Sequence, residues 1–89
     1  MPKVVFTANI QRHVSCPDTV VAGHTVREAL DNFFAGNPQS QSYVLDDQQA
    51  LRRHMSVFVD GELIRDRKGL TDPVGEHGTI YVFQSLSGG

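Results

Sequence analysis

The chain has 89 residues, 20% of them charged, with a formal net charge of -2. This length suits one domain with a modest core and leaves too little for a deep catalytic cleft as well. The charge balance gives no strong positive field, so nucleic-acid binding is disfavoured. No apolar run reaches the roughly 20 residues of a membrane helix, no signal segment is visible, and the single Cys16 cannot form an internal disulfide. We therefore expect a cytoplasmic protein.

The first part of the chain reads as two strands. Residues 4–8 are rich in β-branched and apolar side chains, which favour a strand, and 11–12 look like a turn. A second strand is expected over 13–15 and 19–22, interrupted at Pro17 because proline cannot donate to a ladder. Since the two strands are so close in sequence, a hairpin is their simplest arrangement.

A helix is predicted over 26–35. Thr25 and Glu28 fit a capping box, in which the glutamate reaches back to the N-cap. The apolar residues that follow have helical spacing and form one stripe: Val26, Ala29, Leu30, Phe33 and Phe34. Gly36 suits a left-handed C-cap, and Pro38 is expected to prevent continuation.

The second half reads as a loop followed by strands. The loop covers 37–50, with a short helical turn near 45–50. Asp60-Gly61 is a type I′ turn signal, because both central positions need positive φ. Around and after this turn we expect strands at 55–59, 62–65 and 79–84.

The order β-β-α-β-β-β predicts an α+β domain over 1–84, with a mixed sheet of four to five strands packed on one main helix. The first and last strands are the most continuously apolar, so they should be central. For Tyr81 and Phe83 the sequence leaves open whether they join the core or face a partner. Residues 85–89 are expected to form a flexible tail.

The chemical feature of the tail is Gly88-Gly89. Glycine has no Cβ, so such an arm can thread a narrow channel, although a chance glycine-rich end is the alternative. ATP can convert a terminal carboxylate to an acyl-adenylate, and sulfur can then displace AMP to give a thiocarboxylate. At up to about 3.5 Å per residue, residues 85–89 would reach roughly 17 Å.

Together these features resemble the MoaD/ThiS sulfur carriers, which are ubiquitin-like β-grasp proteins. Residues 3–6 are similar to their opening strand, 25–30 to their helix start, and 81–89 to their last strand and tail. The resemblance implies that an E1-like adenylating enzyme of the MoeB/ThiF type uses ATP to activate Gly89, and that a sulfur-accepting synthase takes the sulfur from the resulting thiocarboxylate. The carrier would be a protein cosubstrate, not an enzyme, with no bound cofactor.

By position, the family's partner-facing apolar residues fall on Phe83 and Leu63, and the tail is lined by Leu86 ahead of Ser87. Thr7 stands where molybdopterin carriers usually have an aromatic residue, and this departure weakens the case for a molybdopterin synthase partner.

The resemblance also bears on where the sulfur goes. Thiamin-type carriers are shorter and lack a counterpart to 37–54, whereas 51–60 resembles longer carriers that include cysteine-forming ones. A molybdopterin-type or cysteine-type role is therefore favoured over a thiamin role. Arg52-Arg53 within this segment are candidates to dock an acidic patch on a partner, with a solvated strand entrance as the plainer interpretation.

Other polar residues give no catalytic or metal signal. The four histidines, His13, His24, His54 and His77, lack metal-ligand spacing. The lone Cys16 is expected to be a packed residue. The paired carboxylates are expected to be solvated: Asp46, Asp47, Asp60 and Glu62. Two rival functions stay open. One is a ubiquitin-like modifier that forms isopeptide bonds, and the other is a non-catalytic β-grasp interaction domain.

Overall fold

The computed structural model describes residues 1–14 and 16–84. Along the chain the elements are β1 (Lys3–Phe6), α1 (Ala8–Gln11), β2 (Thr19–Val20), α2 (Val26–Gly36), α3 (Pro38–Val44), β3 (Met55–Val59), β4 (Glu62–Leu63) and β5 (Thr79–Gln84). The strands form one sheet in the order β2-β1-β5-β3-β4. β1 and β5 run parallel, and the other neighbouring pairs are antiparallel. The predicted mixed sheet, with the first and last strands adjacent at its centre, is confirmed.

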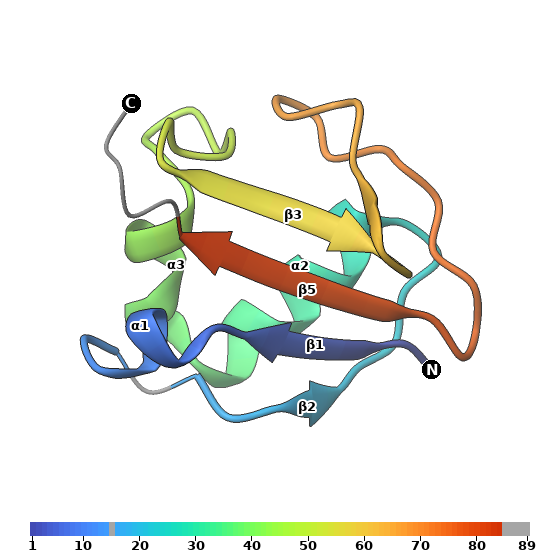
Figure 1. Ribbon diagram of the computed structural model, residues 1–89, viewed down its shortest axis with the longest axis horizontal. Helices are drawn as coiled ribbons and strands as arrows, with labels where there is room; N and C mark the ends of the chain where they lie inside the picture. The colour runs from blue at the N-terminus through green and yellow to red at the C-terminus, as the bar shows by residue number, and fades with distance from the viewer. Residues whose placement is uncertain (15, 85–89) are drawn as a thin grey trace.

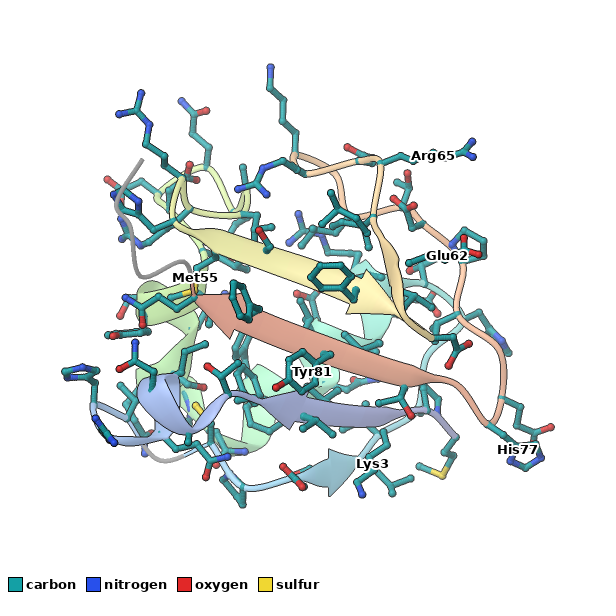
Figure 2. All side chains as sticks on the ribbon, viewed as in Figure 1. Lys3, Met55, Glu62, Arg65, His77 and Tyr81 are labelled. Atoms are coloured by element: carbon teal, nitrogen blue, oxygen red, sulfur yellow. The ribbon has the colours of Figure 1, made fainter. Side chains whose placement is uncertain are left out.

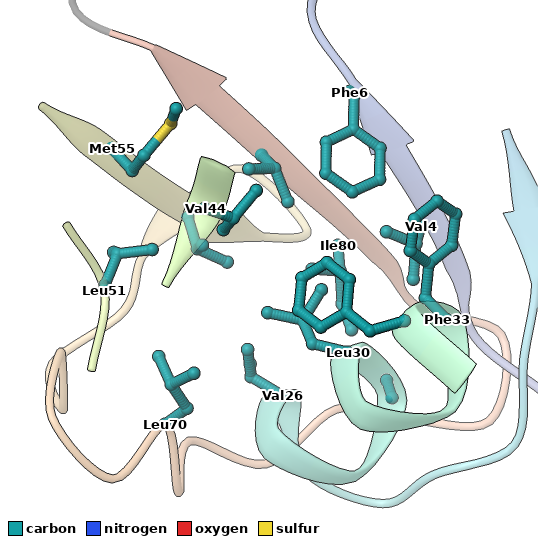
Figure 3. Packing of buried hydrophobic residues seen from close by; sticks show 14 of the residues in the cluster. Val4, Phe6, Val26, Leu30, Phe33, Val44, Leu51, Met55, Leu70 and Ile80 are labelled. Carbon is teal, nitrogen blue, oxygen red and sulfur yellow. The ribbon is translucent and has the colours of Figure 1, made fainter. Parts of the chain in front are cut away.

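In the view of Figure 1, α2 lies behind the sheet, while α1 and α3 lie beyond the ends of β1 and β5. One face of the sheet is therefore covered by α2, and the other is turned to the viewer. The covered face packs on the apolar stripe of α2, whose five predicted core residues are all buried. Phe6 of β1 and Phe33 of α2 lie with ring centroids 4.8 Å apart. Figure 3 shows these rings beside Leu30 and Ile80, in a core that joins helix and sheet.

The start of α2 follows the predicted capping pattern with one change. Thr25 Oγ1 accepts a hydrogen bond from the Glu28 amide at 3.2 Å. The Glu28 carboxylate, however, accepts from the amide of His24 at 2.8 Å, one residue before the N-cap. Gly36 is the last residue of the helix, and Asn37 is the C-cap. The prediction of a left-handed Gly36 was wrong, because Gly36 is not among the residues with positive φ.

The loop predicted over 37–50 was wrong in its first half, where α3 lies. Pro38 occupies the first turn of this helix, where a missing amide N–H costs nothing. Thus Pro38 ends α2 and begins α3. Residues 45–50 form a turn closed by a bridge between Leu45 and Leu51, not the predicted helical turn.

Three strand boundaries also needed correction. β1 ends at Phe6 because Ala8 begins α1, and the strand predicted at 13–15 is absent over 13–14, where the His13 amide donates to the Ile10 carbonyl at 2.9 Å. β2 is confined to Thr19–Val20. β4 stops at Leu63, because the amides of residues 65 and 66 donate to the carboxylate of Asp72 and not to a neighbouring strand. The type I′ turn at Asp60-Gly61 is confirmed by φ values of 50° and 87°.

Candidate functional site: the outer sheet face and the end of β5

The uncovered face of the sheet carries apolar side chains. Along β5 the side chains alternate, so that Ile80 and Val82 are buried while Tyr81 and Phe83 are 40% and 39% exposed. Tyr81 stands on the face turned to the viewer in Figure 2. The question left open by the sequence is thus answered for these two aromatic residues, which lie at the surface.

Strand register assembles these residues into one surface. Tyr81 of β5 pairs with Val5 of β1 on one side and with Phe58 of β3 on the other. Phe58 in turn pairs with Leu63 of β4. Two residues further along β5, Phe83 pairs with Ser56. We call the apolar members of this set the outer apolar face: Val5, Phe58, Leu63, Tyr81 and Phe83. Leu63 is its most exposed member, at 56%. Val5 and Phe58 were not predicted as site residues, although Val5 lies between two buried residues and Phe58 follows the buried Val57.

β5 ends at Gln84, whose side chain is held from two sides. Its Oε1 accepts hydrogen bonds from Asn9 Nδ2 at 3.3 Å and from the Tyr43 hydroxyl at 3.2 Å. These contacts tie the end of β5 to α1 and α3. The predicted tail residues Leu86, Ser87, Gly88 and Gly89 lie outside the described residues.

Thr7 lies beside this end of β5. Its amide donates to the Val82 carbonyl at 3.1 Å, which continues the parallel pairing one residue beyond β1. Its hydroxyl oxygen is buried and has no partner among the described residues. The position that departs from the molybdopterin-carrier pattern therefore adjoins the last residues of β5.

Arg52 and Arg53 lie close to the same end. Met55, the first residue of β3, is paired with Gln84, so the segment just before it adjoins the end of β5. The Arg52 Nε donates to the Ser42 carbonyl at 2.8 Å, while the Arg53 side chain is exposed. The structure thus brings the basic pair and Phe83 to one end of the sheet.

Among the described residues are the titratable side chains predicted to be packed or solvated, including Cys16 and Asp60. No group of three or more His, Cys, Asp or Glu in residues 1–14 and 16–84 is placed to hold a metal ion. Burial raises the pKa of the Cys16 thiol, against a smaller opposing effect of a hydrogen bond with Ser40, so the thiol is not activated. Asp60, at the start of β5, accepts the Thr79 amide at 2.9 Å and serves the backbone. Over the same described ranges, no helix is both long and apolar enough to cross a membrane.

A mixed sheet wrapped on one main helix, with its central strand leading to the end of the chain, defines the ubiquitin-like β-grasp fold. No family model and no curated protein matches the sequence.

Solved structures do match. SAMP1 from Haloferax volcanii is 24% identical with a TM-score of 0.77, covering 99% of this chain and 98% of its own. The small archaeal modifier protein 1 from Methanosarcina acetivorans is 21% identical with a TM-score of 0.79, over 99% and 95%. A chain of the Amycolatopsis orientalis BexX/CysO complex is 22% identical with a TM-score of 0.82, over 100% of both. These likenesses confirm the resemblance at the level of the fold.

Proposed function

We propose that this chain is a sulfur carrier protein whose working group is the carboxyl of Gly89. The observation that carries the proposal is the course of β5. This central strand presents Tyr81 and Phe83 to solvent and leads directly into the residues that end in Gly88-Gly89. One strand thus joins a recognition surface to a reactive end, as a cosubstrate requires.

The proposed chemistry takes place in partner enzymes. A carboxylate oxygen of Gly89 attacks the α-phosphorus of ATP, and pyrophosphate leaves. A sulfide-level sulfur donor then attacks the acyl carbon, the bond to AMP breaks, and a thiocarboxylate remains. On an acceptor synthase the thiocarboxylate sulfur attacks an electrophilic carbon of the acceptor, and the leaving group of that carbon departs. Water then cleaves the acyl–sulfur bond, which leaves the sulfur on the acceptor and restores the carboxylate of Gly89. ATP is bound by the activating E1-like enzyme, so the carrier itself needs no cofactor.

The outer apolar face supplies the docking surface in this proposal. Tyr81 and Phe83 lie on the strand that leads into the tail, and Leu63 extends the face to the sheet edge. A partner that covers this face removes apolar area from water, which favours association by about 25 cal/mol per Å² before the costs of binding. Docking there would hold the tail's origin fixed while Leu86 and the glycines enter the partner.

The named neighbours support a partnered, non-catalytic role. One matching chain was solved within the BexX/CysO complex, and two matching proteins are named modifiers. Because the sequence favours the longer carriers, we propose a molybdopterin-type or cysteine-type acceptor pathway in the cytoplasm.

The test is the intact mass of the untagged protein after incubation with ATP, sulfide and an E1-like enzyme from the same cell. We expect a gain equal to the replacement of one oxygen by sulfur. A chain lacking Gly89, whose fold is verified by circular dichroism, should show no gain. An unchanged mass of the full chain with every such enzyme would overturn the proposal.

A second candidate function is protein modification, because two of the matching structures are small archaeal modifier proteins. A modifier uses the same adenylate but transfers the Gly89 acyl group to a lysine amine. Chymotryptic digestion of cell proteins, which cuts after Leu86, and mass spectrometry for a Ser-Gly-Gly remnant on lysine separate the two. Conjugates that vanish when Gly89 is deleted would establish the modifier role.

A further inference from the structure

The charges of this protein are distributed unevenly along the direction of β5. Around the start of the strand lie three carboxylates, those of Asp60, Glu62 and Glu76, and two cations, Lys3 and Arg65 (Figure 2). At its end lie the segments 7–14, 38–45 and 52–55, which contain no Asp or Glu. We call the basic side chains of these segments the basic end: Arg12, His13, Arg52, Arg53 and His54.

The basic end is built on a fixed backbone. The Arg67 guanidinium donates to the carbonyls of Arg52 at 2.9 Å and Met55 at 2.7 Å, which pins the chain where it enters β3. On the other side of β5, the His13 ring stacks on Tyr43 with centroids 5.8 Å apart. Tyr43 also donates a hydrogen bond to Gln84, and Met55 pairs with Gln84. The segments that carry His13 and Arg53 are therefore both fixed to the end of β5.

Among the described residues, no carboxylate forms an ion pair with Arg12, Arg52 or Arg53. Within the described chain the ion pair observed is Arg27–Asp31 on α2, at 3.8 Å. Asp46 and Asp47 line a shallow groove with Arg52, but no ion pair joins them, and Asp46 Oδ1 accepts the amides of Gln48 and Ala50. The positive charge at this end is therefore available to a partner.

The groove nearest the end of β5 extends this surface. Tyr43, Met55 and Gln84 line it together with Arg52 and His54. Its lining is mostly apolar and includes the Arg52 cation, so it suits a protein segment that carries a carboxylate beside an apolar side chain.

We propose that the basic end docks an acidic rim around the partner site that receives the tail. This inference rests on the proposed function. A chain with net charge -2 is repelled as a whole by an acidic surface, so only an approach with the basic end first is favourable. That approach presents the end of β5, and hence the tail, to the partner before any other part of the molecule. The unequal charge distribution therefore orients the encounter, and the outer apolar face then secures it.

The test compares two charge-matched double variants of the full chain. Arg12→Glu with Arg53→Glu reverses the basic end without removing a side-chain hydrogen bond seen in the described structure. Lys3→Glu with Arg65→Glu makes the same charge change at the opposite end, where Figure 2 places both residues far from Met55. Titration calorimetry with the E1-like enzyme, without ATP, measures Kd at about 50 mM NaCl, where charges are weakly screened, and at about 500 mM NaCl, where they are strongly screened.

We expect the basic-end variant to raise Kd roughly tenfold at low salt and by less than about twofold at high salt. The opposite-end variant carries the same added negative charge farther from the rim, so it should raise Kd by less than about threefold at low salt. Equal effects of the two variants, or unchanged binding of the basic-end variant, would overturn the inference. If the basic-end variant proves unstable, Arg12→Gln with Arg53→Gln makes the same comparison with a smaller expected shift.

The mass assay separates this inference from the proposed function. Suppose that the wild type gains sulfur and that the basic-end variant gains it equally fast at low carrier concentration and low salt. This result contradicts the proposed acidic rim but leaves the carrier function standing. A wild-type chain that gains none contradicts the carrier function and the inference that rests on it.

Discussion

Asp66 organises the loop between β4 and β5. Its Oδ1 accepts the Gly69 amide at 2.8 Å, and its Oδ2 accepts the Thr71 hydroxyl. The hydrogen bonds from Thr71 and Gly69 lower the pKa of Asp66 to about 2. The pKa of Asp72 is lowered too, first by the Arg65 amide. These carboxylates hold backbone turns in place, so their lowered pKa values are features of the fold and not signs of acid–base chemistry.

This arrangement predicts the pH dependence of an Asp66→Asn variant. The folded-state pKa of about 2 lies below the unfolded value of about 3.9, so the carboxylate stabilises the fold above pH 4. That contribution is lost as the pH falls from about 4 to about 2. Thermal unfolding should therefore give the variant a lower midpoint at pH 7, with the difference from wild type shrinking across this range. Asp47→Asn, at a carboxylate with no hydrogen bond in the described structure, is the control and should show no such convergence.

At the scale of the elements, two glycines flank α2 in opposite ways. Gly23 has φ of +149°, and a Cβ there would lie 2.7 Å from the Ala29 amide nitrogen. Gly36 is helical, and a Cβ there meets nothing within 4 Å. The first glycine is therefore required by the close approach of the chain to α2, and the second is not.

We expect Gly23→Ala to destabilise the protein by about 1–3 kcal/mol, because the backbone on both sides of the clash must shift. Gly36→Ala should stabilise it by up to about 0.5–1 kcal/mol, since alanine loses less entropy in a helix. Urea unfolding at neutral pH measures both. A stabilising Gly23→Ala would contradict the packing described for this turn.

The same elements show what the sequence could and could not predict. α2 was predictable from its N-cap and its apolar stripe, and β5 from its continuous run of β-branched and aromatic residues. α1 and α3 were missed because they are short, and because Pro38 is compatible with both an end and a start. For the candidate site, the sequence pointed to Phe83, Tyr81 and Leu63, but only strand register shows that Val5 and Phe58 join them. Pairing between distant strands is a tertiary property that local patterns do not encode.

At the scale of the whole molecule, one face of β5 belongs to the core and the other to the surface. Its inward side chains pack on α2, and its outward side chains form the outer apolar face. Its two ends differ in charge as well. The outer apolar face, which we propose as the docking surface, therefore takes no side chain from the core.

This division predicts opposite effects of two substitutions in one strand. Ile80 is fully buried, so Ile80→Ala should cost about 2–5 kcal/mol in urea unfolding. Phe83 is 39% exposed, so Phe83→Ser should cost only about 1 kcal/mol. In the mass assay at low carrier concentration, however, Phe83→Ser should slow sulfur loading at least about tenfold, because a central interface aromatic residue often contributes 2 kcal/mol or more to binding.

The folded fraction of Ile80→Ala, measured at the assay temperature, provides the comparison. Once its rate is corrected for that fraction, the variant should load sulfur like the wild type, because its partner surface is unchanged. If Phe83→Ser instead loads at the wild-type rate while remaining folded, the outer apolar face is not where the activating enzyme docks. Recognition would then depend on the basic end and the tail, and reversing the charge of the basic end would remove most of the binding free energy.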